Sequence, residues 1–83
     1  MKKYKAQIKI TLRKGILDVQ GKAVEHALHS IEFKMLSDVR IGKYIELYVE
    51  AENSEKAKSL VSIASEKLIA NPIIEDFEIK IIE

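Results

Sequence analysis

The sequence predicts a single α+β domain in which a four-stranded antiparallel sheet carries two helices on one face. Three observations lead to this prediction. Apolar residues recur at every second position in some segments and at every third or fourth position in others. The two kinds of segment follow one another in the order β-α-β-β-α-β. The length of 83 residues suits one domain, so the whole range 1–83 is assigned to it.

The beginning of the chain predicts a strand followed by a helix. Apolar and polar residues alternate from Tyr4 to Leu12, which is typical of a strand with one buried face. Gly15 ends the alternation. Asp18 is expected to cap the helix, because its carboxylate can accept hydrogen bonds from the free N–H groups of the first turn. The buried stripe of that helix is expected at Val24, Ala27, Leu28 and Ile31.

The middle of the chain predicts a hairpin. The segment 36–41 is expected to form a strand with Val39 and Ile41 pointing inward, and Gly42-Lys43 is expected to form the tight turn. Alternation then resumes from Tyr44 to Ala51. One face of this strand would carry Ile45, Leu47, Val49 and Ala51, and the other Tyr44, Glu46, Tyr48 and Glu50.

The end of the chain predicts a second helix and a last strand. Asn53 or Ser54 is expected to cap the helix, and Asn71-Pro72 to end it, because proline cannot continue a helix. Its buried stripe is expected at Ala57, Leu60, Val61, Ala64 and Leu68. The last strand would turn Phe77, Ile79 and Ile81 inward. A ferredoxin-like sandwich would bury all of these apolar faces between its sheet and its helices.

The composition excludes several classes of function. There is no cysteine, and 14 Lys and Arg residues are balanced by 13 Asp and Glu residues. We therefore expect no disulfide or thiolate metal site, and no general attraction to nucleic acid or to a membrane. The N-terminal stretch MKKYKAQIKI is too polar for a signal peptide, and no apolar run approaches the ~20 residues of a membrane span. A cytoplasmic location is the expectation.

The stretch KGILDVQGKAVEHALHS resembles a phosphate-binding loop at a strand-to-helix junction, but it fails the motif G-x-x-x-x-G-K-[ST]. Five residues separate Gly15 from Gly21 where the motif has four, and Ala23 replaces the hydroxyl that would hold Mg²⁺. We interpret Gly15 as a turn glycine and Gly21 as a glycine of the first helical turn. Gly21 would still allow a partner or an anion to approach the helix end closely.

No metal site or catalytic set is predicted. His26 and His29 are the only histidines, and a tight metal site needs three or four ligands, with Glu25 as the nearest further candidate. No serine or threonine stands in a motif that would link it to a base. The carboxylates are spread over the outer faces of strands and helices, as expected for solvated surfaces.

The outer face of the sheet allows two interpretations. Tyr44 and Tyr48 lie where RNA-binding sheets place stacking aromatics, but Glu46 and Glu50 would repel phosphates, and the RNA-recognition consensus is absent from IGKYIELYVE. A protein interface suits this mixed face better. The alternative is a solvated face with cross-strand Lys–Glu pairs.

Three stretches together resemble the PurS subunit of phosphoribosylformylglycinamidine synthase: LDVQGKAVEHALHS, VRIGKYIEL and LIANPIIEDFEI. They follow in the order and spacing of that family through essentially the whole chain. The family usually has proline after the aspartate where this chain has Val19, which is a small departure because proline is favoured but not required there.

The resemblance implies a non-catalytic small subunit in the fourth step of purine synthesis. Such a subunit forms a homodimer or higher homo-oligomer, joins a large synthetase subunit and a glutaminase subunit, and can aid the passage of ammonia between them. ATP and Mg²⁺ would bind the large subunit, and this chain would hold no cofactor and no catalytic residue. The positions assigned to turns and contact surfaces are Gly21, Lys22, Gly42, Lys43, Tyr44, Tyr48, Asn71 and Pro72.

A second class of function stays open at this point. Regulatory modules of the ACT type have a similar topology and bind amino acids at dimer interfaces near a glycine-bearing first loop. Gly15 and Gly21 are compatible with such a module.

Overall fold

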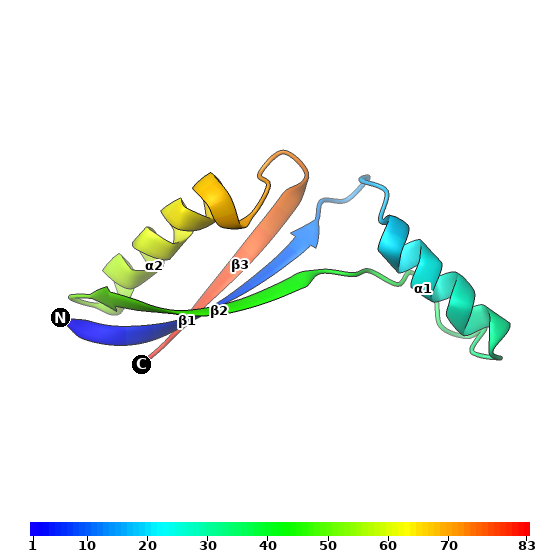
Figure 1. Ribbon diagram of the computed structural model, residues 1–83, viewed down its shortest axis with the longest axis horizontal. Coiled ribbons are helices and arrows are strands. Elements are labelled where there is room, and N and C mark those ends of the chain that lie inside the picture. The colour runs from blue at the N-terminus through cyan, green and yellow to red at the C-terminus, as the bar shows by residue number, and fades with distance from the viewer.

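The computed structural model describes residues 1–83 and contains a three-stranded antiparallel sheet, not the four-stranded sheet expected from the sequence. The strands lie in the order β2-β1-β3. Figure 1 shows one helix lying over the sheet and the other held beyond its end. The elements in chain order are β1 (Lys2–Leu12), α1 (Val19–Ser30), β2 (Lys43–Ala51), α2 (Ser54–Ala64), a π-helical turn (Ser65–Ile69) and β3 (Glu75–Ile82).

The central strand β1 confirms the alternation predicted for it. It pairs with β2 from Lys2↔Ala51 to Ile10↔Lys43, and with β3 on its other edge. Its inward residues are almost fully buried: Tyr4, Ala6, Ile8 and Ile10. The inward residues of β2 and β3 also alternate as predicted, but apart from the buried Ala51 they are only half-buried.

The predicted hairpin at Gly42-Lys43 is wrong, because segment 36–41 is not a strand. This segment returns along α1 instead of pairing with β2. Two contacts hold it there: the Val39 N–H donates to the Glu25 carboxylate at 3.2 Å, and His29 Nε2 lies 2.6 Å from the Leu36 carbonyl oxygen. Side-chain groups of α1 thus replace the strand partner that the alternation of Val39 and Ile41 suggested.

The helix α2 packs on the sheet, but its buried line differs from the predicted stripe. Asn53 caps it, with its side chain accepting a hydrogen bond from the Lys56 N–H at 2.9 Å. Ala57 and Val61 are buried as expected, and Ser65 continues their line into the π-helical turn. The remaining residues of the predicted stripe are exposed: Leu60, Ala64 and Leu68. One helix on a narrow sheet buries one narrow line of residues.

The helix α1 makes no substantial contact with the sheet, which corrects the expectation of two helices on one face. Of its residues only Gly21 is buried. Val24 is 40% and Ile31 60% exposed, although both were expected in the core. The segment 17–41, which we call the arm, extends the molecule to 52 × 25 × 14 Å. Neither helix is long and apolar enough to cross a membrane.

Candidate functional site

Asp18 joins the two ends of the arm through hydrogen bonds to two backbone N–H groups. As predicted, it caps α1: one carboxylate oxygen accepts from the Gly21 N–H at 2.8 Å. The other oxygen accepts from the Ile41 N–H, also at 2.8 Å. These two hydrogen bonds lower the pKa of the Asp18 carboxyl, because both favour its charged form. The hydrogen bond from Ile41 has the larger effect. The carboxylate therefore joins the start of α1 to the residue that precedes Gly42.

Gly21 lets helix α1 and segment 36–41 approach each other closely. A Cβ at this position would overlap the Val39 carbonyl oxygen and lie 2.7 Å from an Asp18 carboxylate oxygen. The close contact expected at this glycine therefore exists, but its partner is segment 36–41 of the same chain. This close approach is the structural reason for a glycine inside the first turn, where it disfavours the helix.

Gly42 and Lys43 lie where the arm joins β2. A Cβ on Gly42 would lie 2.6 Å from the Ile10 carbonyl oxygen, so this glycine allows close backbone approach and does not form the predicted tight turn. The Lys43 ammonium pairs with the Glu75 carboxylate at 3.4 Å, and the Glu75 side chain is only 11% exposed. This pair ties the first residue of β2 to the first residue of β3.

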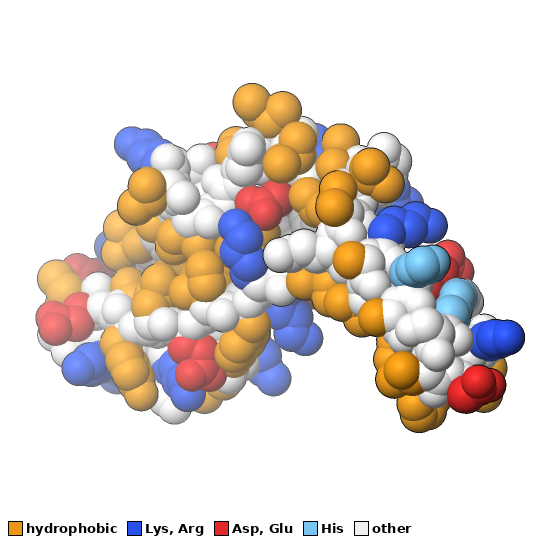
Figure 2. Space-filling view, turned by 45° about the vertical axis from the view of Figure 1, so that its right-hand side comes forward, with side chains coloured by type: hydrophobic (Ala, Val, Ile, Leu, Met, Phe, Trp, Pro, Cys, Tyr) orange, Lys and Arg blue, Asp and Glu red, His pale blue; other side chains and the backbone are white.

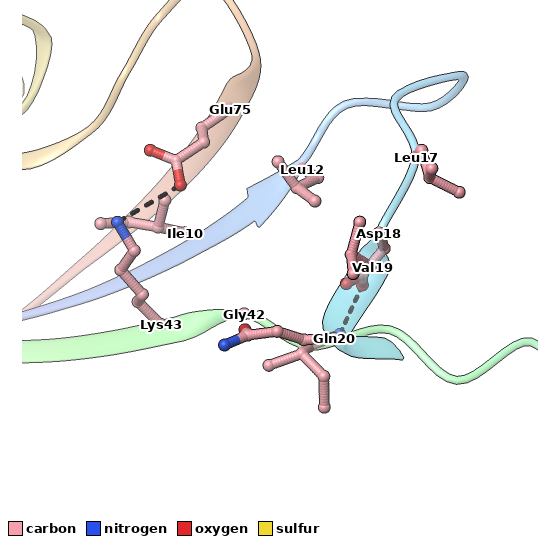
Figure 3. Close-up of a pocket in the computed structure, with 10 residues that line it drawn as sticks. Ile10, Leu12, Leu17, Asp18, Val19, Gln20, Gly42, Lys43 and Glu75 are labelled. Atoms are coloured by element: carbon pink, nitrogen blue, oxygen red, sulfur yellow. Dashed lines mark hydrogen bonds and ion pairs between the residues drawn. The ribbon is translucent and has the colours of Figure 1, made fainter. Parts of the chain in front are cut away.

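A pocket of about 250 Å³ opens between the arm and the sheet (Figure 3). Figure 3 shows the Lys43–Glu75 pair on one side of the pocket and Asp18 on the other, with Leu12 between them. The lining is mostly uncharged: Ile10, Leu12, Leu17, Asp18, Val19, Gln20, Ile41, Gly42, Lys43 and Glu75. The charged groups of this lining already have partners within the chain.

The outer face of the sheet carries the two predicted tyrosines in an exposed polar cluster. The Tyr44 hydroxyl donates to the Glu46 carboxylate at 2.7 Å, and the Lys5 ammonium lies 3.3 Å from the same oxygen. The hydrogen bond to Glu46 raises the pKa of Tyr44, and the same bond together with Lys5 lowers the pKa of Glu46. The Lys3 ammonium stands 5.2 Å from the centre of the Tyr48 ring. The cross-strand Lys–Glu pairing considered from the sequence is thus present on this face.

Asn71 and Pro72 form a connection before β3, remote from the tyrosines. The Asn71 side chain accepts from the Ile73 N–H at 3.1 Å, and its own N–H donates to the Glu75 carboxylate at 2.7 Å. Arg13 donates from its side chain to the Pro72 carbonyl oxygen and pairs with Asp76 at 3.3 Å. The role of Asn71 in ending a helix and starting a turn agrees with the sequence prediction.

The structure brings some of the predicted contact residues together and separates others. Gly42 and Lys43 line the pocket at the base of the arm together with Asp18, which also binds the Gly21 N–H. Lys22 lines a separate hollow that shares Asp18. The tyrosines and the Asn71-Pro72 connection belong to other surfaces. Sequence reasoning missed Arg40, which donates to the Leu12 carbonyl oxygen across this base, because an isolated arginine in a presumed strand carries no signal of its partner.

No group of three or more His, Asp or Glu side chains is placed to hold a metal ion. His29 lies against the Leu36 carbonyl oxygen, whereas His26 is exposed. The fold and these surfaces define the class of the protein: a small α+β domain with an arm that is held away from its sheet and exposes several apolar side chains.

Comparison with known proteins identifies the family. A model of the PurS family, described as phosphoribosylformylglycinamidine (FGAM) synthase, matches residues 5–83. The PurS subunit of phosphoribosylformylglycinamidine synthase from Bacillus subtilis is 44% identical over 80 residues, which cover 96% of this chain and 94% of that one. The chain therefore belongs to the PurS family, whose members are subunits of phosphoribosylformylglycinamidine synthase.

Solved structures of relatives share the fold. PurS from Methanocaldococcus jannaschii, described as one of the subunits of formylglycinamide ribonucleotide amidotransferase in the purine biosynthetic pathway, has 40% identity and a TM-score of 0.85, covering 94% of each chain. A chain in the structure of PurLQS from Thermotoga maritima has 35% identity and a TM-score of 0.90, covering 99% of this chain and 100% of that one. The resemblance inferred from LDVQGKAVEHALHS and its companion stretches is confirmed.

Proposed function

We propose that this chain is the small, non-catalytic subunit of a phosphoribosylformylglycinamidine synthase, and that it assembles the synthetase and glutaminase subunits for purine biosynthesis. The observation that carries the proposal is the match over 99% of the chain, with a TM-score of 0.90, to a chain in the structure of PurLQS from Thermotoga maritima. This match supports a role inside a complex of that kind. It favours assembly over the amino-acid-binding module considered as the alternative.

The arrangement of side chains supports an assembly role for a second reason. The charged groups at the base of the arm pair with one another, as Lys43 does with Glu75, or with backbone groups, as Asp18 does. These charged groups therefore stabilise the fold of the chain itself. Several large hydrophobic side chains of the arm are exposed, among them Val24, Ile31 and Met35. Extended exposed apolar surfaces of this kind are typical of sites that contact other proteins.

Self-association is part of the proposed function. A small domain buries little surface by itself, and the exposed apolar arm offers the chain more burial. We therefore expect a homodimer or a higher homo-oligomer, with Gly21, Lys22, Gly42 and Lys43 at the base of the contacting arm. Tyr44, Tyr48, Asn71 and Pro72 lie on surfaces that stay open to the larger subunits.

The cofactors of the reaction are assigned to the partners. ATP and Mg²⁺ would bind the large subunit, where the phosphoryl chemistry takes place, and the cytoplasm is the expected compartment. The stretch from Gly15 to Lys22 supports this division, because Asp18 and the Val39 carbonyl oxygen occupy the space beside Gly21 that a phosphate would need.

Reconstitution tests the proposal. The purified chain is added to the large subunit and the glutaminase subunit, and formation of formylglycinamidine ribonucleotide is followed with glutamine as the nitrogen source and with ammonium chloride in its place. We expect the chain to increase the glutamine-dependent rate at least tenfold and to leave the ammonium-dependent rate nearly unchanged. An unchanged glutamine-dependent rate, over a range of chain concentrations, would contradict the assembly role.

A further inference from the structure

No helix covers the outer face of the sheet. The helix α2 packs on the inner face, where alternate residues of β1 are buried, and α1 makes no substantial contact with the sheet. The outward residues that lie between the buried ones are not themselves buried: Lys3, Lys5, Gln7 and Lys9. Figure 2 shows blue, red and orange side chains mixed along the lower left of the molecule, on the side of the sheet away from α2. A sheet face that the chain itself leaves open is available to another protein.

Two tyrosines of β2 are exposed on this face and are held in position by their neighbours. Tyr44 is 53% exposed and Tyr48 is 66% exposed. The Tyr44 hydroxyl donates to the Glu46 carboxylate at 2.7 Å, and the Lys3 ammonium lies 5.2 Å from the centre of the Tyr48 ring. A side chain that is already held in place loses little conformational entropy when a partner binds. Because tyrosine is enriched among the residues that contribute most to protein binding, these two rings suit a protein contact.

A hollow of about 190 Å³ lies on the same face, between β1 and β3. Its charged side chains are Lys9, Glu78 and Lys80, and Gln7 lines it with them. Gln7 stands opposite Lys80 in the ladder and Lys9 stands opposite Glu78, so the two lysines are diagonal neighbours. The four ion pairs of the chain use neither of these two ammonium groups. Both ammonium groups are therefore free to bind a group of another molecule.

The charges of this face indicate what kind of surface fits it. In the hollow, two lysines accompany one glutamate, so one positive charge is left without a counterpart. A single carboxylate between Lys9 and Lys80 would balance that charge and accept hydrogen bonds from both ammonium groups. Beside the tyrosines, Glu46 is already paired with Lys5 at 3.3 Å, so no further charge is needed there. The complementary surface therefore has one acidic side chain opposite the hollow and uncharged side chains opposite the tyrosines.

We propose that the outer face of the sheet docks on the large synthetase subunit, with a carboxylate of that subunit between Lys9 and Lys80 and uncharged side chains on Tyr44 and Tyr48. The inference rests on the proposed assembly role and specifies the surface that carries it. An open face three strands wide needs a broad surface opposite it, which favours the larger partner as the occupant. The exposed apolar side chains of the arm lie outside this face and take no part in the docking.

Charge reversal at the hollow tests the docking. Lys9→Glu and Lys80→Glu are combined in one chain, and the dissociation constants for the large subunit and for the glutaminase subunit are measured by biolayer interferometry with the chain immobilised. The matched control combines Lys58→Glu and Lys67→Glu, which change the net charge equally at exposed positions of α2 and the π-helical turn. A second variant, Tyr48→Ala, removes a ring from the face and leaves the charge unchanged. Circular dichroism and light scattering check that each variant keeps its fold and its mass.

We expect the charge-reversed chain and Tyr48→Ala each to bind the large subunit about tenfold more weakly than the natural chain, and the control chain to bind like the natural one. Affinities that are the same in all four chains would overturn the docking while the assembly role stands. An equal loss in the control chain, a loss of affinity for the glutaminase subunit only, or a change in the mass of the free chain would also overturn it. A natural chain that binds neither subunit would overturn the assembly role itself.

Discussion

At the scale of single residues, the contacts at the base of the arm depend on residues that other residue types cannot replace. Gly21 has a carbonyl oxygen where any side chain would begin, and Asp18 uses both of its carboxylate oxygens on backbone N–H groups. Asp18 is recognisable from the sequence as a helix cap. Its second bond, to Ile41, is not recognisable, because it joins positions far apart in the chain.

Gly21→Ala tests the close approach of Gly21 to the Val39 carbonyl oxygen. The informative result is the sign of the change in the free energy of unfolding. In an ordinary helix this substitution stabilises by about 1 kcal/mol. Here we expect it to lower the free energy of unfolding by about 1–3 kcal/mol, because the new methyl group overlaps the Val39 carbonyl oxygen. Urea denaturation measures the change. Gly15→Asn is the control, since Gly15 has a φ of 87° and open space around it, and a gain in stability for Gly21→Ala would contradict the packing described here.

Asp18→Asn tests the double hydrogen bond through its pH dependence. The folded-state pKa of Asp18 lies below its ordinary value of 3.8, so the carboxylate stabilises the fold above that value and loses this contribution as the pH falls through the folded-state pKa. The amide can keep one acceptor but not both. We expect the variant to be less stable than the natural chain at pH 7, with the difference shrinking below about pH 4. A difference that is the same at pH 7 and pH 3 would contradict this role.

At the scale of elements, the π-helical turn places an unusual residue in the core. Ser65 is fully buried, and its hydroxyl has no hydrogen-bond partner. A buried hydroxyl without a partner has a desolvation cost that a methyl group does not have. The sequence prediction placed Ala64 in the core instead. Ser65 continues the four-residue spacing of Ala57 and Val61, but serine is mostly an exposed residue and was not expected there.

Ser65→Ala tests this arrangement. Removal of the unpaired hydroxyl is expected to raise the free energy of unfolding by about 1 kcal/mol, and the alanine also favours the helix. Thermal denaturation of the two chains at equal concentration measures the change. Ser62→Ala, at a partly exposed position three residues earlier, controls for helix propensity alone. A clear loss of stability in Ser65→Ala would mean that the hydroxyl has a partner.

The elements themselves were largely predictable, but their partners were not. Alternation correctly identified the inward residues of β1, such as Ile8 and Ile10, and the caps at Asp18 and Asn53 were confirmed. Periodicity shows that one side of α1 is apolar and does not show what covers it. The prediction that Val24 and Ile31 lie in the core of this chain was therefore wrong. Segment 36–41 alternates like a strand, but it is held by Glu25 and His29 of α1.

At the scale of the whole molecule, the extended shape connects the fold with assembly. The chain measures 52 Å along its longest axis because the arm continues beyond the sheet. Apolar surface that a compact domain would bury within itself is therefore exposed to solvent. An exposed apolar surface suits a chain that contacts other proteins, and the members of the PurS family, to which this chain belongs, are subunits of a synthase.

Dependence on other copies predicts a concentration-dependent stability. Anything that binds only the folded chain stabilises it by mass action, so an associating chain becomes more stable as its concentration rises. We expect the melting temperature to increase by several degrees over a hundredfold rise in chain concentration. Ala27→Glu, which places a charge on the exposed apolar line of α1, should abolish this increase and leave the secondary structure intact. A melting temperature independent of concentration in the natural chain would argue against self-association.

Co-elution with the partner subunits tests the central claim most directly. The chain is mixed with the large synthetase subunit and the glutaminase subunit in the presence of glutamine, ATP and Mg²⁺, and the mixture is passed through a size-exclusion column with light-scattering detection. We predict a single species that contains all three chains and that does not form when this chain is left out. Elution of the chain by itself, with the two larger subunits unchanged, would contradict its role as the assembling subunit.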